Sequence, residues 1–268
     1  MRCANRDCGK SGSGSILKGR ELCLMSDHSQ DLMPVVILAG GRATRLRPLT
    51  DEIPKALVDV AGHPFLWHQL ELLKRHRARR VVLAVGYLGE CIEQRFGDGS
   101  ELGIELQYSY DGPVLLGTGG AVRQALQLLP DRFFVLYGDS YLTCDYQVVE
   151  AAFRQSGRRG LMTVFRNDGQ FDTSNVEFEN GRIVRYDKRN HTPAMRHIDY
   201  GLGAFDRAVF AKIPAGQKCD LAEIYQNLLE DGDLAAFEVH ERFYEIGSPA
   251  GLRETIHFFR TKRLINSR

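Results

Sequence analysis

Two glycines and several basic residues directly follow the apolar run 34–38. The segment LAGGRATRLRPLTDEIPKAL, residues 38–57, contains three arginines and one lysine. Glycine lets backbone N–H groups approach an anion, while arginine and lysine neutralise its charge. The segment matches neither the Walker A pattern nor the Rossmann glycine pattern. It therefore predicts a phosphate-binding loop of another kind, with a solvated basic turn as the alternative.

A carboxylate ends a near-continuous apolar run, FFVLYGDS at 133–140. An apolar strand of this kind is typical of a parallel sheet buried on both faces. Such a strand delivers the residues after it to a crevice at the carboxyl edge of the sheet. We therefore expect Asp139 to face that crevice, although an aspartate here can also be a simple turn or cap residue.

The elements that must position these residues alternate between short apolar runs and helical stretches. This alternation predicts an α/β fold, layered α/β/α with a mostly parallel central sheet. Asn180-Gly181 suits a two-residue type I′ turn, and Ser248 with Pro249 suits the start of a helix. We expect strands at 35–38, 81–85, 161–165, 175–178, 182–186, 197–205 and 235–239, and one within the segment 133–140. We expect helices at 67–76, from the glycines at 117–120, at 221–231 and from 249.

Residues 1–32 are rich in glycine, serine and charge and lack periodicity, so we predict a disordered tail before a domain at 33–268. Met25 or Met33 is then a candidate natural start. Three of the six cysteines, Cys3, Cys8 and Cys23, lie in this tail. They would need a fourth ligand such as His28 to hold zinc, and their spacing matches no zinc module. We expect reduced cysteines rather than a disulfide framework.

The composition narrows the classes of partner. Thirty-five basic and thirty-four acidic residues give a net charge of +1 among 268 residues, which argues against a nucleic-acid partner. No apolar run is long enough to span a membrane. We therefore expect a cytoplasmic protein with small-molecule partners.

Five segments together resemble the sugar-1-phosphate nucleotidyltransferase, or pyrophosphorylase, family. The loop at 38–57 is similar to its signature L-A-G-G-x-G-T-R-L-x-P-L-T followed by P-K. The other four follow in the family's order: LLGTGGAV at 115–122, FVLYGDS at 134–140, RYDK at 185–188 and FYEIGSPAGL at 243–252. The resemblance covers residues 34–260 and implies a Rossmann-like nucleotidyltransferase fold, also described as GT-A-like.

The resemblance implies a role for each matching residue. Arg45 and Lys55 would clamp a nucleoside triphosphate, with backbone contacts to the nucleotide from Gly40 and Gly41. Gly117 and Thr118 would line the base. Lys188 would bind the phosphate of the sugar, and contacts to the sugar itself would come from Asp187 and Asp199.

Mg²⁺ is the cofactor that the resemblance implies, with Asp139 and Glu245 as its ligands. Magnesium is usually held by one or two carboxylates together with phosphate oxygens and water. Three places depart from the family pattern. Tyr110-Asp111-Gly112 stands where many relatives present a glutamine or glutamate towards the base, and an extra residue before LGTGG leaves the identity of the base open there. Glu245 stands where the family has aspartate, and Ala43 stands where it has glycine. If the backbone at Ala43 needs a positive φ, alanine costs roughly 1 kcal/mol there.

The implied reaction joins a nucleoside triphosphate and a sugar 1-phosphate to give a nucleotide sugar and pyrophosphate. GTP and a manno-configured sugar are the favoured pair by overall similarity. Enzymes of this type often form dimers or tetramers, so a homo-oligomer is one expected state. Two alternatives stay open: a glycosyltransferase that uses a nucleotide sugar, and a non-catalytic regulatory subunit that binds one.

Overall fold

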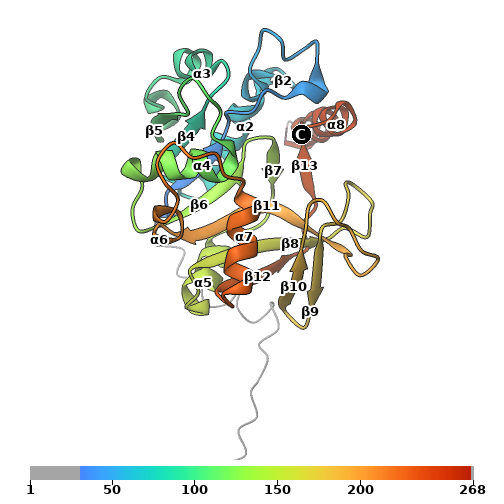
Figure 1. The fold of residues 1–268 in the computed structure, drawn as a ribbon. Coiled ribbons are helices and arrows are strands. Elements are labelled where there is room, and N and C mark those ends of the chain that lie inside the picture. Colours follow the sequence, from blue (N-terminus) through green and yellow to red (C-terminus); the bar gives the residue numbers. More distant parts are fainter. Residues whose placement is uncertain (1–30, 267–268) are drawn as a thin grey trace, which may run out of the picture.

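The computed structural model describes residues 31–266, with side chains described as far as Lys262, and Figure 1 shows its arrangement. Nine strands form the central sheet. Its main path runs β10-β9-β11-β6-β1-β4-β5, and β8 pairs with β11 and β12. The strands are β1 (Val35–Leu38), β4 (Arg80–Val85), β5 (Glu105–Tyr110), β6 (Arg132–Tyr137), β8 (Gly160–Arg166), β9 (Val176–Glu179), β10 (Arg182–Tyr186), β11 (His197–Asp206) and β12 (Leu234–Val239).

The half of the sheet that carries the glycine-rich loop is parallel. β1 pairs in parallel with both β4 and β6, and β4 pairs in parallel with β5. β11 then runs antiparallel to β6 and β8. The loops after β1, β4 and β6 therefore leave the sheet at one edge, the edge where ligands bind in open α/β sheets.

Helices cover both faces of the sheet, as Figure 1 shows. Alternate residues of each strand point to opposite faces, so Val35 and Ile37 join one apolar core while Val36 joins the other. The first core contains residues of α2 (Phe65–Arg75), α3 (Gly89–Phe96), α5 (Tyr146–Ser156) and α8 (Pro249–Asn266). The second contains residues of α4 (Gly117–Ala125), α6 (Ala208–Ala211) and α7 (Leu221–Glu230). The predicted layered α/β/α fold is confirmed.

Two short strand pairs complete the architecture. β2 (Asp59–Val60) pairs with β3 (His63–Pro64), and β7 (Ser140–Leu142) pairs with β13 (Phe243–Glu245). The second pair matters for the site, because its register places Glu245 opposite Ser140, the residue after Asp139. The backbone N–H of Ile246 also donates to the carbonyl of Asp139 at 2.9 Å.

The structure contains every element predicted from the sequence, and it adds α3, α5, α6, β5 and the four short strands β2, β3, β7 and β13. At the amino end, Leu32 is 5% exposed and bridges to Ala78, so the folded part includes this residue of the predicted tail. Residues 1–30 of that tail, with Cys3, Cys8, Cys23 and His28, lie outside the described residues. Within the described residues the cysteines, Cys91, Cys144 and Cys219, are free thiols.

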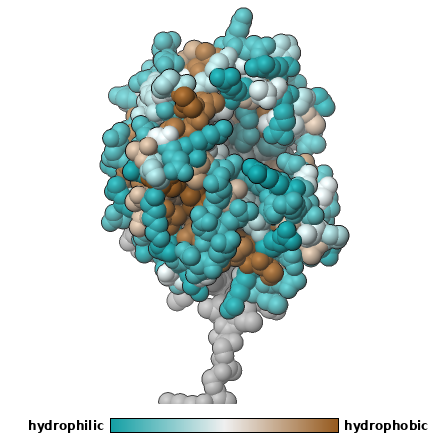
Figure 2. All heavy atoms as spheres, in the orientation of Figure 1, coloured by the Kyte–Doolittle hydropathy of each residue, from teal (hydrophilic) through white to brown (hydrophobic). Residues whose placement is uncertain are grey.

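None of the helices in the described part of the chain has the length and apolar character needed to cross a membrane. Figure 2 shows a mainly hydrophilic face, with hydrophobic side chains exposed over limited areas.

Candidate active site

The loop after β1 is held in shape by its own contacts. Ala43 adopts the left-handed conformation at φ 46° and ψ 44°, so the position does require a positive φ and alanine accepts the strain. The Thr50 hydroxyl donates to the Ala43 carbonyl at 2.9 Å, and two side chains of the loop itself, Thr50 and Leu46, are buried. Pro54 leads directly into the short 3₁₀ turn Lys55–Leu57. The loop therefore presents Lys55 from a fixed backbone.

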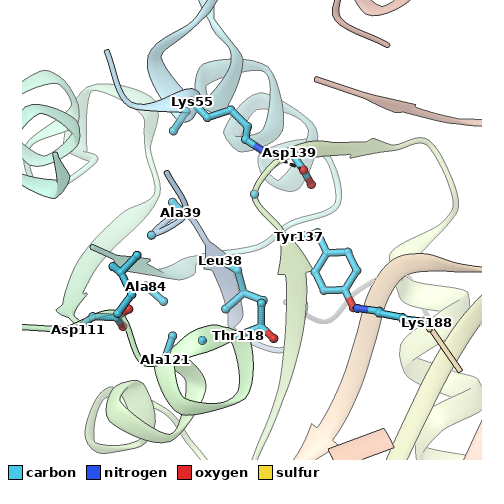
Figure 3. A pocket seen from close by; sticks show the side chains of 16 residues that line it. Leu38, Ala39, Lys55, Ala84, Asp111, Thr118, Ala121, Tyr137, Asp139 and Lys188 are labelled. Atoms are coloured by element: carbon cyan, nitrogen blue, oxygen red, sulfur yellow. Dashed lines mark hydrogen bonds and ion pairs between the residues drawn. The ribbon is translucent and has the colours of Figure 1, made fainter. Parts of the chain in front are cut away.

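Lys55 and Asp139 meet at the carboxyl edge of the sheet, and Figure 3 shows the contact. The Lys55 Nζ lies 2.9 Å from the Asp139 Oδ2, and both side chains are largely buried. Burial acts to raise the pKa of Asp139. The ammonium of Lys55, a backbone hydrogen bond and the guanidinium of Arg45 together outweigh this effect and hold that pKa below its usual value. Asp139 is therefore ionised at neutral pH.

Glu245 brings a second carboxylate to the same place. A side chain built on Gly247 would put its Cβ 2.9 Å from the Asp139 Oδ2, 2.9 Å from the Glu245 Oε2 and 3.1 Å from an Arg45 Nη. These three groups thus surround one point, and a glycine keeps that point open. The Glu245 carboxylate also accepts hydrogen bonds from the backbone N–H groups of Gly247 and Ser248 and, at 2.6 Å, from the Ser248 hydroxyl.

This donor set fits Mg²⁺. Asp139 and Glu245 offer oxygen ligands that face a common point, and a carboxylate keeps free lone pairs after accepting two or three hydrogen bonds. Within residues 31–262, no cluster of three or more His, Cys, Asp or Glu side chains could hold a metal ion. A magnesium ion bound by these two acids would thus take its other ligands from phosphate oxygens and water.

The loop at 115–120 forms the opposite wall and is supported by a segment a hundred residues away. Gly117 has φ 73°, and a Cβ there would lie 2.6 Å from the Cys219 carbonyl oxygen. The Thr118 hydroxyl donates to Asp220 at 3.2 Å and accepts from the Leu221 N–H at 2.7 Å. The start of α7 therefore fixes this loop, and the hydroxyl of Thr118 is already used in doing so.

Two cavities meet between these walls. The first has a volume of about 350 Å³, and Figure 3 shows alanines and Asp111 at one end of it, with Asp139 and Lys188 at the other. Gly40, Gly41, Gly117 and Thr118 also line this cavity. The second has a volume of about 440 Å³ and is lined by Arg45, Asp199 and Glu245. Tyr137, Asp139 and Lys188 line both cavities.

Contacts with two tyrosines hold Lys188 at the junction of the cavities. Its Nζ donates to the Tyr137 hydroxyl at 3.3 Å and lies over the rings of Tyr137 and Tyr186, at 5.2 and 6.0 Å from their centroids. Both hydroxyls in turn donate to the Asp199 carboxylate, at 2.7 Å from Tyr137 and 3.2 Å from Tyr186. Burial first, and then the charge of Asp199, raises the pKa of Tyr137 well above its usual value, so its hydroxyl stays protonated.

The predicted site residues thus divide into groups. Arg45, Lys55, Asp139, Glu245 and Lys188 come together, as do the glycines and Thr118 around the first cavity. Asp199 lines the second cavity, but its carboxylate is occupied by the tyrosines and by the Gly201 N–H at 3.1 Å.

Asp187 lies apart from these groups. The structure does not bring it to either cavity, because its side chain accepts from the Arg189 and Asn190 N–H groups at 2.8 and 2.9 Å. The N–H groups of Asn190 and Arg189 lower the Asp187 pKa to about 2. Asp187 therefore holds the turn after β10, and its contact with a sugar stays a prediction.

Sequence reasoning missed Tyr137, which lies between the cavities. The signal was present, since Tyr137 is the last residue of the buried strand that ends at Asp139. Nothing in the sequence marks Asn175, Thr173 or His191, which line the second cavity from the loops that flank β9 and β10.

Replacing Tyr137 by phenylalanine should raise the KM for one substrate by about tenfold. This substrate is the sugar phosphate, which the family resemblance places beside Lys188. The change removes the acceptor for Lys188 and one donor to Asp199, and a hydrogen bond to a charged group contributes about 1.5–3 kcal/mol. Steady-state kinetics at saturating nucleotide checks this. Tyr186→Phe is the matched control, since it removes a donor to Asp199 without touching the acceptor of Lys188. An equal rise in KM for both variants would contradict the positioning role of Tyr137.

The layered sheet, the basic loop after β1 and the acid after β6 define a nucleotide-binding protein of the Rossmann-like α/β class. Comparison with known proteins narrows this class. A sequence model described as "Nucleotidyl transferase" matches residues 34–262. The chain therefore belongs to the nucleotidyl transferase family, which confirms the resemblance found in the sequence.

Individual relatives agree with this family. The chain is 33% identical over 225 residues to the mannose-1-phosphate guanylyltransferase catalytic subunit beta of Danio rerio. This alignment covers 81% of this chain and 62% of the relative. It is also 33% identical over 233 residues to the mannose-1-phosphate guanylyltransferase of Mycobacterium tuberculosis, covering 84% of this chain and 63% of the relative. The chain thus spans less than two thirds of the length of these relatives.

A solved structure shows the same fold. The crystal structure of a putative glucose-1-phosphate thymidylyltransferase from Bacillus anthracis aligns with a TM-score of 0.76 at 21% identity, covering 84% of this chain and 94% of that one.

Proposed function

We propose that the protein joins a nucleoside triphosphate to a sugar 1-phosphate and releases pyrophosphate. The observation that carries this proposal is the junction of the two cavities, where Asp139 and Lys188 line both and Lys55 reaches Asp139. One cavity suits a nucleotide and the other a sugar phosphate. Their shared wall lies where the two sets of phosphates would meet.

The chemistry needs no nucleophilic side chain. An oxygen of the sugar 1-phosphate, already anionic at neutral pH, attacks the α-phosphorus and forms the new P–O bond. The bond between the α-phosphorus and its bridging oxygen breaks, and pyrophosphate leaves with that electron pair. The protein must then hold two anions together and neutralise their charge. Lys55, Arg45 and Lys188 supply positive charge, and Mg²⁺ on Asp139 and Glu245 would neutralise phosphate oxygens.

Pyrophosphate release with Mg²⁺ tests this proposal directly. The purified protein is incubated with each common nucleoside triphosphate and a panel of sugar 1-phosphates, and the nucleotide sugar is identified by mass spectrometry. We expect pyrophosphate only when both substrates are present. Transfer of sugar from a nucleotide sugar would instead indicate a glycosyltransferase. Binding of a nucleotide sugar without turnover of any pair would indicate a regulatory subunit.

GTP is the proposed nucleotide, with a manno-configured sugar 1-phosphate as its partner. The printed names of the relatives from Danio rerio and Mycobacterium tuberculosis support this pair. The first cavity adds support at its alanine-lined end, where Asp111 accepts from the Leu116 N–H at 3.1 Å through Oδ2. The Asp111 Oδ1 has no hydrogen-bond partner among residues 31–262. A carboxylate can only accept hydrogen bonds, and guanine presents adjacent N1–H and N2–H donors.

Replacing Asp111 by asparagine should remove the preference for GTP over ITP, which lacks the 2-amino donor. We expect wild-type kcat/KM for GTP to exceed that for ITP by about 10-fold or more, because a hydrogen bond to a charged group contributes about 1.5–3 kcal/mol. In Asp111→Asn, the amide oxygen still accepts from Leu116, and the two nucleotides should differ by less than about threefold. The KM for the sugar phosphate is the internal control. An unchanged ratio in the variant would place guanine recognition elsewhere.

A further inference from the structure

Gly251 is the third residue of α8. Neither its backbone conformation nor its position in the helix requires a glycine. It is not among the glycines with positive φ, and it lies in regular helix. Glycine is among the poorest helix formers, so a long helix loses stability by placing one in its first turn. Some other requirement must keep a side chain out of this position.

The carboxylate of Glu245 occupies the space that a side chain at Gly251 would need. A Cβ built on Gly251 overlaps the Glu245 Cδ and Oε1 atoms. The Ser248 hydroxyl donates to the same Oε1 at 2.6 Å and accepts from the Gly251 N–H at 3.0 Å. Glu245 therefore folds back over the first turn of α8, and its carboxylate rests directly on the Gly251 Cα.

The length of the Glu245 side chain makes this space necessary. Pairing with β7 fixes the Glu245 backbone opposite Ser140. The distance from the backbone at position 245 to Asp139 is therefore fixed, whichever acid stands there. Aspartate, which the family pattern has here, would end one methylene earlier. The longer glutamate reaches its place, with Oε2 beside the point shared by Asp139 and Arg45, only by lying over α8.

We propose that Gly251 is a positioning residue, which leaves the space in which the Glu245 carboxylate rests so that this carboxylate faces Asp139. Glu245 and Gly251 then form a matched pair, in which the absent side chain at 251 compensates for the longer acid at 245. The expected effect on turnover rests on the proposed function. The steric relation between the two residues does not.

The kinetic test uses Gly251→Ala, Glu245→Asp and the double variant. In Gly251→Ala the flexible glutamate must leave its place, so we expect kcat/KM to fall by about 10²-fold and the Mg²⁺ concentration for half-maximal rate to rise. Aspartate is too short to meet the new methyl group. The double variant should therefore be no slower than Glu245→Asp alone. Ala250→Ser, which adds one heavy atom at the neighbouring exposed position, should match the wild type.

Thermal melting without metal or substrate provides a readout that does not depend on activity. Gly251→Ala should lower Tm more with Glu245 present than in the Glu245→Asp background, by at least about 2–4 °C. A Cβ at 251 also lies 2.8 Å from the Glu245 carbonyl oxygen, but this contact is common to both backgrounds and cancels in the comparison.

Two results with folded variants would overturn the proposal. Gly251→Ala with wild-type kinetics and metal dependence would show that the space is not needed. Equal effects of Gly251→Ala on Tm in both backgrounds would show that residue 251 does not act through Glu245. If the wild type releases no pyrophosphate, the proposed function fails. The melting comparison still tests whether residues 245 and 251 are a matched pair. If Gly251→Ala alone fails to fold, a folded double variant supports the pairing and an unfolded one contradicts it.

Discussion

Asp139→Asn is expected to abolish turnover while the protein still folds. The amide keeps the shape of the side chain but carries no negative charge, so it can neither hold a magnesium ion with Glu245 nor pair with Lys55. We expect kcat to fall by about 10³-fold, the upper end of the loss seen when one electrostatic group is removed from such a site. Pyrophosphate release measures the rate, and circular dichroism with thermal melting checks the fold.

Asp51→Asn is the control for this variant. It removes an exposed carboxylate from the loop after β1, where Asp51 pairs with Arg47 on the surface, and it should leave the rate within about twofold, as expected of an exposed ion pair. Near-normal turnover by Asp139→Asn would refute a metal-binding role for this acid.

Lys55→Met should lower kcat by about 10²–10³-fold and shift the acid limb of the pH–rate profile upward. Under the proposed function the Lys55 ammonium would face the substrate phosphates, so its loss should lower the rate. The shift follows from the balance at Asp139, where burial raises the pKa and the charge of Lys55 lowers it. Without Lys55, only a backbone hydrogen bond and the charge of Arg45 still oppose the effect of burial. The pKa of Asp139 then rises, and the active ionised form is lost at a higher pH as the solution is acidified.

The profile of kcat/KM against pH for wild type and variant measures this shift. Arg42→Ala is the matched control, because it removes a positive charge from the same loop at an exposed position that lines neither cavity. An acid limb at the same pH in Lys55→Met and wild type would show that Lys55 does not set the ionisation of Asp139.

The sequence predicted the parts of the site that follow buried strands. The loop after Val35–Leu38 and the acid after Arg132–Tyr137 were predictable, because parallel strands deliver the residues that follow them to one edge of the sheet. Ala43 could be identified as a strained position because glycine usually stands there in the family, and the structure gives it a positive φ.

The remainder of the site depends on pairings between distant residues, which local patterns do not encode. Glu245 reaches Asp139 through the register of two three-residue strands a hundred residues apart. Thr118 is held by the start of α7, and its partner Asp220 also lies about a hundred residues away. Asp199 was expected to face a sugar, yet two tyrosine hydroxyls hold its carboxylate in place. The positions of these three side chains depend on tertiary packing rather than on the periodicity of the sequence.

A crystal structure with Mn²⁺ and a GTP analogue that cannot be cleaved between its α- and β-phosphates tests the central claim most directly. Anomalous scattering locates the metal, and the density locates the phosphates. We predict a metal peak about 2.1 Å from an Asp139 carboxylate oxygen, with the Lys55 ammonium on the triphosphate and the base beside Asp111. A triphosphate bound away from Lys55 and Asp139, with no metal between the carboxylates of Asp139 and Glu245, would contradict the account.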